Sequence, residues 1–80
     1  MEELRLYAKK AVGTKAVLRV LKAREAARVY VASDIDTFLY QKVTRACEEA
    51  GVPVRKVESS MELGRTCGLT IACAAAAMLK

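Results

Sequence analysis

A stretch near the N-terminus, AVGTKAVLRVLKARE, combines a glycine, a hydroxyl side chain and regularly spaced cations. Lys15, Arg19 and Lys22 follow one another at i, i+4 and i+7, so on a helix they lie on one side. Gly13 and Thr14 would open this helix, with Thr14 as a plausible N-cap. A helix N-terminus presents free backbone N–H groups and a partial positive charge. With these cations, it is suited to bind phosphate oxygens or the O6/N7 edge of guanine.

The net charge of the chain is concentrated around this stretch. The 80 residues carry a formal charge of +5. Residues 1–24 hold seven Lys or Arg and two Asp or Glu, whereas residues 25–80 hold seven of each. A basic patch on one side predicts an anionic partner, and nucleic acid is the commonest. The alternative is a solvated helix face on a basic protein.

Residues that could support catalysis are scarce. The chain has no histidine and no G-x-S-x-G motif. The segment Gly13-Thr14-Lys15 does not form a phosphate loop, because Ala8 stands where the first glycine of that motif is required. Asp34 and Asp36 could bind a divalent metal, but helix capping explains them better because a helix is expected to start there. We therefore predict that the protein is not an enzyme and uses no cofactor or metal.

The three cysteines, Cys47, Cys67 and Cys73, are odd in number and form no CxxC motif. No secretory signal precedes them, so we expect reduced, mostly buried thiols in a cytoplasmic protein. A metal site would lack histidine and suitable thiolate spacing, and a cysteine nucleophile would lack its usual base.

Apolar periodicity and capping residues predict alternating helices and strands. A short helix is expected at Glu2–Ala8, a strand at Lys10–Val12, the basic helix after Gly13, and a strand at Ala27–Ser33. The next helix is expected to start at Asp34 or Asp36 and to end at Gly51. A strand follows at Val54–Val57. The last predicted helix has Ser59 as its N-cap, runs to about Cys67 and is closed by Gly68. The tail LTIACAAAAML is apolar enough for a central strand, although its alanine run fits a helix equally well, and it is too short to span a membrane.

This alternation predicts an α/β fold, a three-layer α/β/α sandwich with helices on both faces of a sheet. The length indicates that residues 1–80 form a single domain. Because aromatic residues make up only 5% of the chain, alanine, valine and leucine must fill its core.

Three segments together resemble a known family: VGTKAVLRVLK, VYVASD and VESSMELGRTCG. They are similar to the ribosomal protein L7Ae/L30e family, whose members bind kink-turn RNA, and most similar to its short bacterial members. The resemblance covers nearly the whole chain. It implies a mixed four-stranded sheet within the sandwich.

The resemblance also implies two RNA-binding surfaces. In the family, the start of the second helix enters the widened major groove at tandem sheared G·A pairs, and the loop before the last helix packs against an unstacked nucleotide. By position, the first surface comprises Gly13, Thr14, Lys15, Ala16 and Arg19, with Lys22 extending the basic side, and the second comprises Val57, Glu58, Ser59 and Ser60. Val57 would offer an apolar surface to the extruded base.

Four positions depart from the pattern of archaeal and eukaryotic members. Lys15 replaces an asparagine and can still donate to guanine, whereas Ala16 replaces a glutamate and cannot accept from guanine N1 or N2. Ser60 replaces a basic residue, and Glu58 would repel the RNA backbone. These differences imply looser and more salt-dependent binding than in an archaeal member.

We therefore expect a monomeric RNA-binding protein that recognises kink-turns in ribosomal RNA or another structured RNA, as a ribosomal or ribosome-associated protein. The alternative is a protein-interaction module of the same fold with only non-specific RNA affinity, favoured by the missing asparagine–glutamate pair.

Overall fold

The computed structural model describes residues 9–80. Its elements, in chain order, are β1 Lys10–Val12, α2 Thr14–Lys22, β2 Ala26–Ala32, α3 Thr37–Ala50, β3 Val54–Val57, α4 Ser60–Thr66 and β4 Ala75–Leu79. The helix predicted at Glu2–Ala8 lies outside the described residues. None of the described helices is long and apolar enough to cross a membrane.

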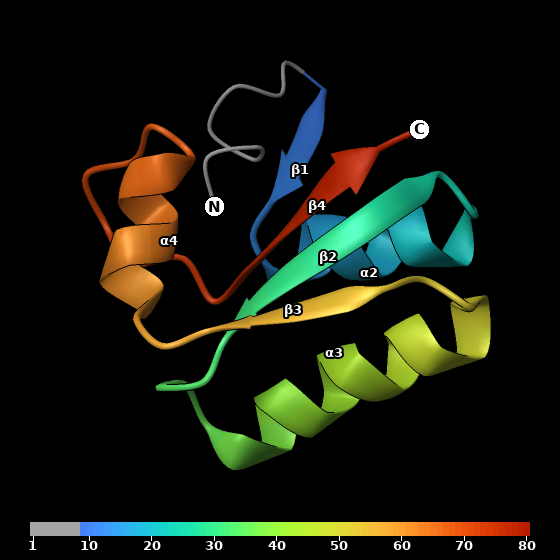
Figure 1. Cartoon of the computed structure of the whole chain (residues 1–80), viewed down its shortest axis with the longest axis horizontal. Coiled ribbons are helices and arrows are strands. Elements are labelled where there is room, and N and C mark those ends of the chain that lie inside the picture. Colours follow the sequence, from blue (N-terminus) through green and yellow to red (C-terminus); the bar gives the residue numbers. More distant parts are fainter. Residues whose placement is uncertain (1–8) are drawn as a thin grey trace.

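The four strands form one mixed sheet in the order β1-β4-β2-β3 (Figure 1). β4, the last strand in the chain, pairs antiparallel with both β1 and β2. β2 and β3 are parallel and are connected through α3. The tail of the chain therefore supplies a central strand, as its apolar composition predicted.

Successive residues of the central strands point to opposite faces of the sheet and build two cores. Val29 and Val31 of β2 join the buried side chains of α2 and α3. Tyr30 and Ala32 join Leu63 of α4 on the other face. Helices therefore cover both faces, and the predicted three-layer sandwich is confirmed for the described residues.

The tail is not a strand along its whole length, because only Ala75–Leu79 pairs with the sheet. Residues 68–74 instead form a loop over α4. The Leu69 N–H donates to the Gly64 carbonyl oxygen (2.8 Å), and the Cys73 N–H donates to that of Ser60 (2.9 Å). These backbone groups are satisfied by a helix rather than by a neighbouring strand.

Gly64 allows this loop to lie directly against α4. A Cβ atom at Gly64 would collide with the carbonyl oxygen of Ile71. Glycine is therefore required at this buried helical position, where it provides the close approach of two backbones.

All three cysteines are free thiols, with Cys47 and Cys73 buried and Cys67 half-buried. Burial raises the pKa of Cys47 to about 11. Burial also raises the pKa of Cys67, and the neighbouring Cys73 adds to the rise. Because the thiolate is the reactive form, Cys47 and Cys67 are poorly suited to nucleophilic chemistry at neutral pH.

Candidate nucleic-acid interface

The sheet topology brings the starts of three helices to the same end of the sheet, the end at which three of the strands stop. β1, β2 and β3 end there and are followed by α2, α3 and α4, while β4 begins there after the loop of residues 68–74. We call this the helix-start edge; in Figure 1 it is the left end of the sheet. Both surfaces predicted from the sequence fall on it.

Gly13, not Thr14, is the N-cap of α2, so the predicted cap is wrong by one residue. Gly13 has φ 97° and ψ 154°, a conformation essentially restricted to glycine. Its N–H donates to the carbonyl oxygen of Ala75 (2.9 Å), which ties the turn to the sheet. This conformation places the cap on a residue without a side chain, and Thr14 becomes the first helical residue. The start of α2 consequently has no side-chain cap.

The basic side chains predicted on α2 are exposed. Lys15, Arg19 and Lys22 lie on its outer side, whereas Val17 and Leu21 are buried against the sheet. Among the described residues, none of the three cations forms an ion pair. Ala16 is only half-buried and packs against the core. Lys22 lies roughly 10 Å along the helix from Lys15, so it extends the basic side away from the start of α2.

The starts of α3 and α4 are capped by side chains. Asp36 accepts hydrogen bonds from the N–H groups of Phe38 (2.9 Å) and Leu39 (3.2 Å). Ser59 accepts from the Glu62 N–H (3.2 Å), as its sequence pattern predicted. Of the two aspartates considered as caps of α3, Asp36 is therefore the cap.

Asp34 links the end of β2 to the start of α4. Its carboxylate accepts from the Ser60 N–H (3.0 Å) and the Ser60 hydroxyl (3.2 Å). Within residues 9–80, no three Asp, Glu, Cys or His side chains form a group that could hold a metal ion. Asp34 and Asp36 serve hydrogen bonds to helix starts instead.

The role predicted for the Val57 side chain is wrong. Val57 is only 8% exposed because it packs beneath α4 with Leu63. Ser59 and Ser60 are half-buried and engaged in the bonds just described, which leaves Glu58 as the exposed member of the second predicted surface. Two strands, β4 and β2, also separate this segment from Gly13, a distance of roughly 14 Å across the sheet.

The loop of residues 68–74 lies closer to the start of α2 and was missed as a candidate surface. It leads into Ala75, the residue that receives the Gly13 N–H. It exposes Thr70, Ala72 and, at 67%, Ile71. Gly68, three residues before Ile71, was the available signal for a loop, but the apolar run that follows favoured a strand.

Comparison with known proteins identifies relatives over almost the entire chain. The family model of the ribosomal protein L7Ae/L30e/S12e/Gadd45 family matches residues 3–80. RNA-binding protein YbxF of Geobacillus stearothermophilus is 46% identical over 69 residues, covering 86% of this chain and 84% of YbxF. An RNA-binding protein of Geobacillus thermodenitrificans is 44% identical over 69 residues, with the same coverage of both chains.

A solved structure supports the same relationship. The 15.5 kDa RNA-binding protein of Giardia lamblia superimposes with a TM-score of 0.87 at 25% identity, covering 99% of this chain and 67% of the Giardia chain. The fold, the sequence relatives and the family match agree, and this chain belongs to the ribosomal protein L7Ae/L30e/S12e/Gadd45 family.

Proposed function

We propose that this protein binds RNA without catalysing a reaction, and that it recognises kink-turns through the start of α2 and the adjacent loop of residues 68–74. The observation that carries the proposal is the uncapped, glycine-opened start of α2 with exposed Lys15 and Arg19 beside it. Several relatives in the same family are named RNA-binding proteins. The physiological RNA we propose is ribosomal RNA or another structured RNA containing a kink-turn.

The start of α2 has the chemistry that an irregular RNA groove requires. Ordinary A-form RNA hides its major groove, so proteins read kinked or unstacked elements instead. Apart from its chain neighbours, no described residue has an atom within 4 Å of where a Cβ of Gly13 would be, so an RNA strand can approach this backbone closely. The free N–H groups of α2 and the Lys15 ammonium are donors for guanine O6 and N7, and Arg19 is placed for a phosphate.

The loop of residues 68–74 would supply the apolar part of the interface. Ile71 is 67% exposed in a loop that is held against α4 and leads to Ala75, the residue bonded to the Gly13 N–H. A base extruded at the kink can pack against this side chain. In our proposal Ile71 takes the role that the sequence suggested for Val57.

Two residues limit affinity. Ala16 offers no acceptor for guanine N1 or N2, and Glu58 adds an exposed negative charge at the same edge. The missing acceptor should cost about 1–3 kcal/mol of affinity or discrimination. Lys15 would contact the guanine as a positively charged group. Binding should therefore weaken steeply as the salt concentration increases.

The test is binding to a short kink-turn hairpin at physiological salt with magnesium, beside a hairpin whose tandem G·A pairs are changed to Watson–Crick pairs. A preference of about tenfold or more, equivalent to roughly 1.4 kcal/mol, supports structure-specific recognition. Equal and salt-sensitive binding to both hairpins contradicts it and leaves only electrostatic attraction.

Substitutions locate the surface. Lys15→Ala and Arg19→Ala should each weaken binding to the kink-turn hairpin by about 1–3 kcal/mol. Lys80→Ala is the matched control, because it removes one exposed positive charge beyond β4, at the opposite edge of the sheet. If all three variants lose affinity equally, the start of α2 is not the binding surface.

A further inference from the structure

The outer surface of α3 carries an exposed aromatic side chain in a basic hollow. Phe38, the only phenylalanine of the chain, is 77% exposed. It lines a hollow of about 410 Å³ with Gln41, Lys42, Arg45, Ala46 and Glu49. An exposed aromatic ring is unremarkable alone, but here it shares a concave surface with an amide and two cations.

The spacing of these side chains places them on one side of α3. Gln41, Lys42 and Arg45 follow Phe38 at i+3, i+4 and i+7, so the four side chains share one side over roughly 10 Å of helix. Phe38 lies in the first turn of α3, which begins beneath the helix-start edge in Figure 1. The hollow thus begins at the helix-start edge and runs away from it.

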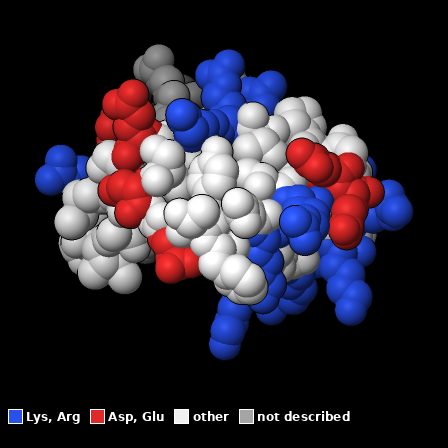
Figure 2. All heavy atoms as spheres, turned by 90° about the horizontal axis from the view of Figure 1, so that it is seen from below, with Lys and Arg blue, Asp and Glu red and all other residues white. Residues whose placement is uncertain are grey.

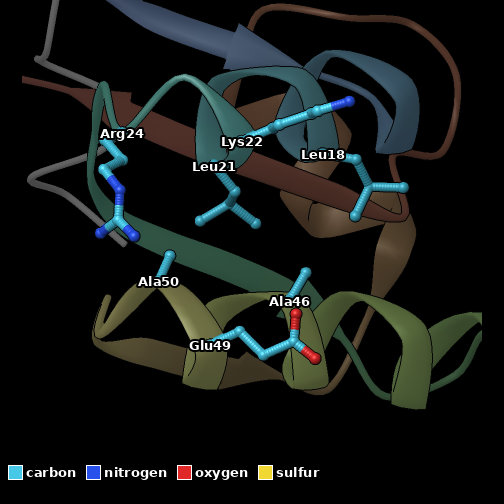
Figure 3. Close-up of a pocket in the computed structure, with 7 residues that line it drawn as sticks. All are labelled: Leu18, Leu21, Lys22, Arg24, Ala46, Glu49 and Ala50. Carbon is cyan, nitrogen blue, oxygen red and sulfur yellow. The ribbon is translucent and has the colours of Figure 1, made fainter.

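A second hollow, of about 240 Å³, continues this surface towards α2. Figure 3 shows Leu18 and Leu21 of α2 pointing towards Ala46 and Ala50 of α3, with the longer side chains of Lys22, Arg24 and Glu49 around them. The two hollows share Ala46 and Glu49. The recessed surface therefore joins the basic side of α2 to the Phe38 side of α3.

The hollow around Phe38 carries two positive charges, Lys42 and Arg45, against one carboxylate, Glu49, which lies where the two hollows meet, so its Phe38 end favours an anion. Figure 2, seen from the α3 side, shows Lys and Arg side chains in the lower right of the view and others along its upper edge, with Asp and Glu side chains at the left and right. Lys42 and Arg45 form no ion pair with another described residue. The acids of α3, Glu48 and Glu49, lie in its last turn, where the helix dipole does not favour them. Asp36, near Phe38, is occupied as the N-cap.

We propose that this hollow binds an unpaired nucleotide of the RNA flanking the kink-turn. The base stacks on the Phe38 ring, the Gln41 amide lies within reach of the base edge, and Lys42 and Arg45 receive the adjacent phosphates. Aromatic rings beside cations bind single-stranded RNA in this way, with little dependence on which base is present. The proposal rests on the RNA-binding function proposed above and adds a second contact to it.

The experiment compares the kink-turn hairpin with the same hairpin extended by a short single-stranded adenosine tail. For the unsubstituted protein, the tail should raise affinity about fivefold to tenfold. Phe38→Ala should bind the blunt hairpin normally and lose the gain from the tail, whereas Phe38→Trp should keep it. The proposal is overturned if the tail adds nothing, or if Phe38→Ala retains the gain.

A second measurement separates this contact from the kink-turn function. A 2-aminopurine reporter placed in an adenosine oligonucleotide loses fluorescence when it stacks on an aromatic ring. Quenching by the unsubstituted protein and not by Phe38→Ala supports the hollow even if neither hairpin is recognised. If Phe38→Ala leaves the quenching and the tail gain unchanged, the stacking site is excluded and the α3 surface is left for a protein partner.

Discussion

The start of α2 and the starts of α3 and α4 lie on the same edge of the sheet but differ in how their backbone groups are satisfied. α3 and α4 are capped by Asp36 and Ser59. α2 begins at Gly13, which has no side chain to offer. Glycine in the N-cap position costs only about 0.3 kcal/mol of helix stability compared with aspartate or serine.

The difference suggests two roles at this edge. The capped starts of α3 and α4 support the structure, whereas the uncapped start of α2 is the surface proposed to recognise RNA. Asp34 and Ser60 join the end of β2 to α4, and Gly64 lets the loop of residues 68–74 pack on the same helix. These contacts fix the frame on which the uncapped α2 start is presented.

The largest effect is expected from Gly64→Ala. The new Cβ would collide with the Ile71 carbonyl, so the loop or α4 must move, at a cost of about 3 kcal/mol in the free energy of unfolding. Chemical denaturation measures this loss. Met61→Ala, an exposed position on the same helix, serves as the control and should change stability far less. Equal losses in both variants would show that the close packing against Ile71 is unimportant.

Gly13→Ala should be the next most damaging change. Alanine rarely adopts φ 97°, and forcing it there costs about 2 kcal/mol of stability. The added Cβ would also point into the open space proposed for RNA.

Gly51→Ala is the matched control for this change. Gly51 also has positive φ, at 68°, but it closes α3 at the other end of that helix. Both variants should be less stable, and only Gly13→Ala should lose RNA affinity beyond its loss of folded protein. Equal RNA affinities of the two folded variants would contradict the assignment of the α2 start.

A smaller effect is expected from Asp36→Ala. Removing the cap frees the N–H groups of Phe38 and Leu39 and should lower stability by about 1 kcal/mol. Thermal unfolding of Asp36→Ala and Asp36→Asn gives the comparison, because asparagine is also a good N-cap. An alanine variant as stable as the asparagine variant would indicate that the cap contributes nothing.

The smallest effect is expected from Thr14→Ala. Because Thr14 is not the cap, its replacement should change stability by less than about 0.5 kcal/mol. A loss near 1 kcal/mol, comparable to that of Asp36→Ala, would restore the capping role first predicted from the sequence. Both variants can be measured in the same denaturation series.

The elements were predictable where local chemistry and tertiary packing agree. Asp36, Ser59 and Gly51 mark helix ends through their own hydrogen bonds or backbone angles, which depend on few distant contacts. The continuous burial of Val29 to Ala32 in β2 follows from the apolar, β-branched composition of a strand covered on both faces. The edge shared by the three helix starts followed from the α/β order once the strand order was known.

The remaining features depend on contacts between distant segments. The shift of the α2 cap to Gly13 depends on the bond to Ala75, and the burial of Val57 depends on α4 packing over it. The importance of Gly64 appears only when the carbonyl of Ile71 lies against it. For the same reason, an apolar composition alone could not separate the loop of residues 68–74 from the strand that follows it.

The central position of β4 has a consequence for the order of events during synthesis. β1 and β2 both pair with β4, so neither antiparallel ladder can form before residues 75–79 have left the ribosome. The parallel unit of β2, α3 and β3 is complete earlier in the chain. The Gly13 turn obtains its partner only with Ala75. The turn at Gly13, part of the surface proposed for RNA, should therefore be fixed only after α2, α3 and α4 have been made.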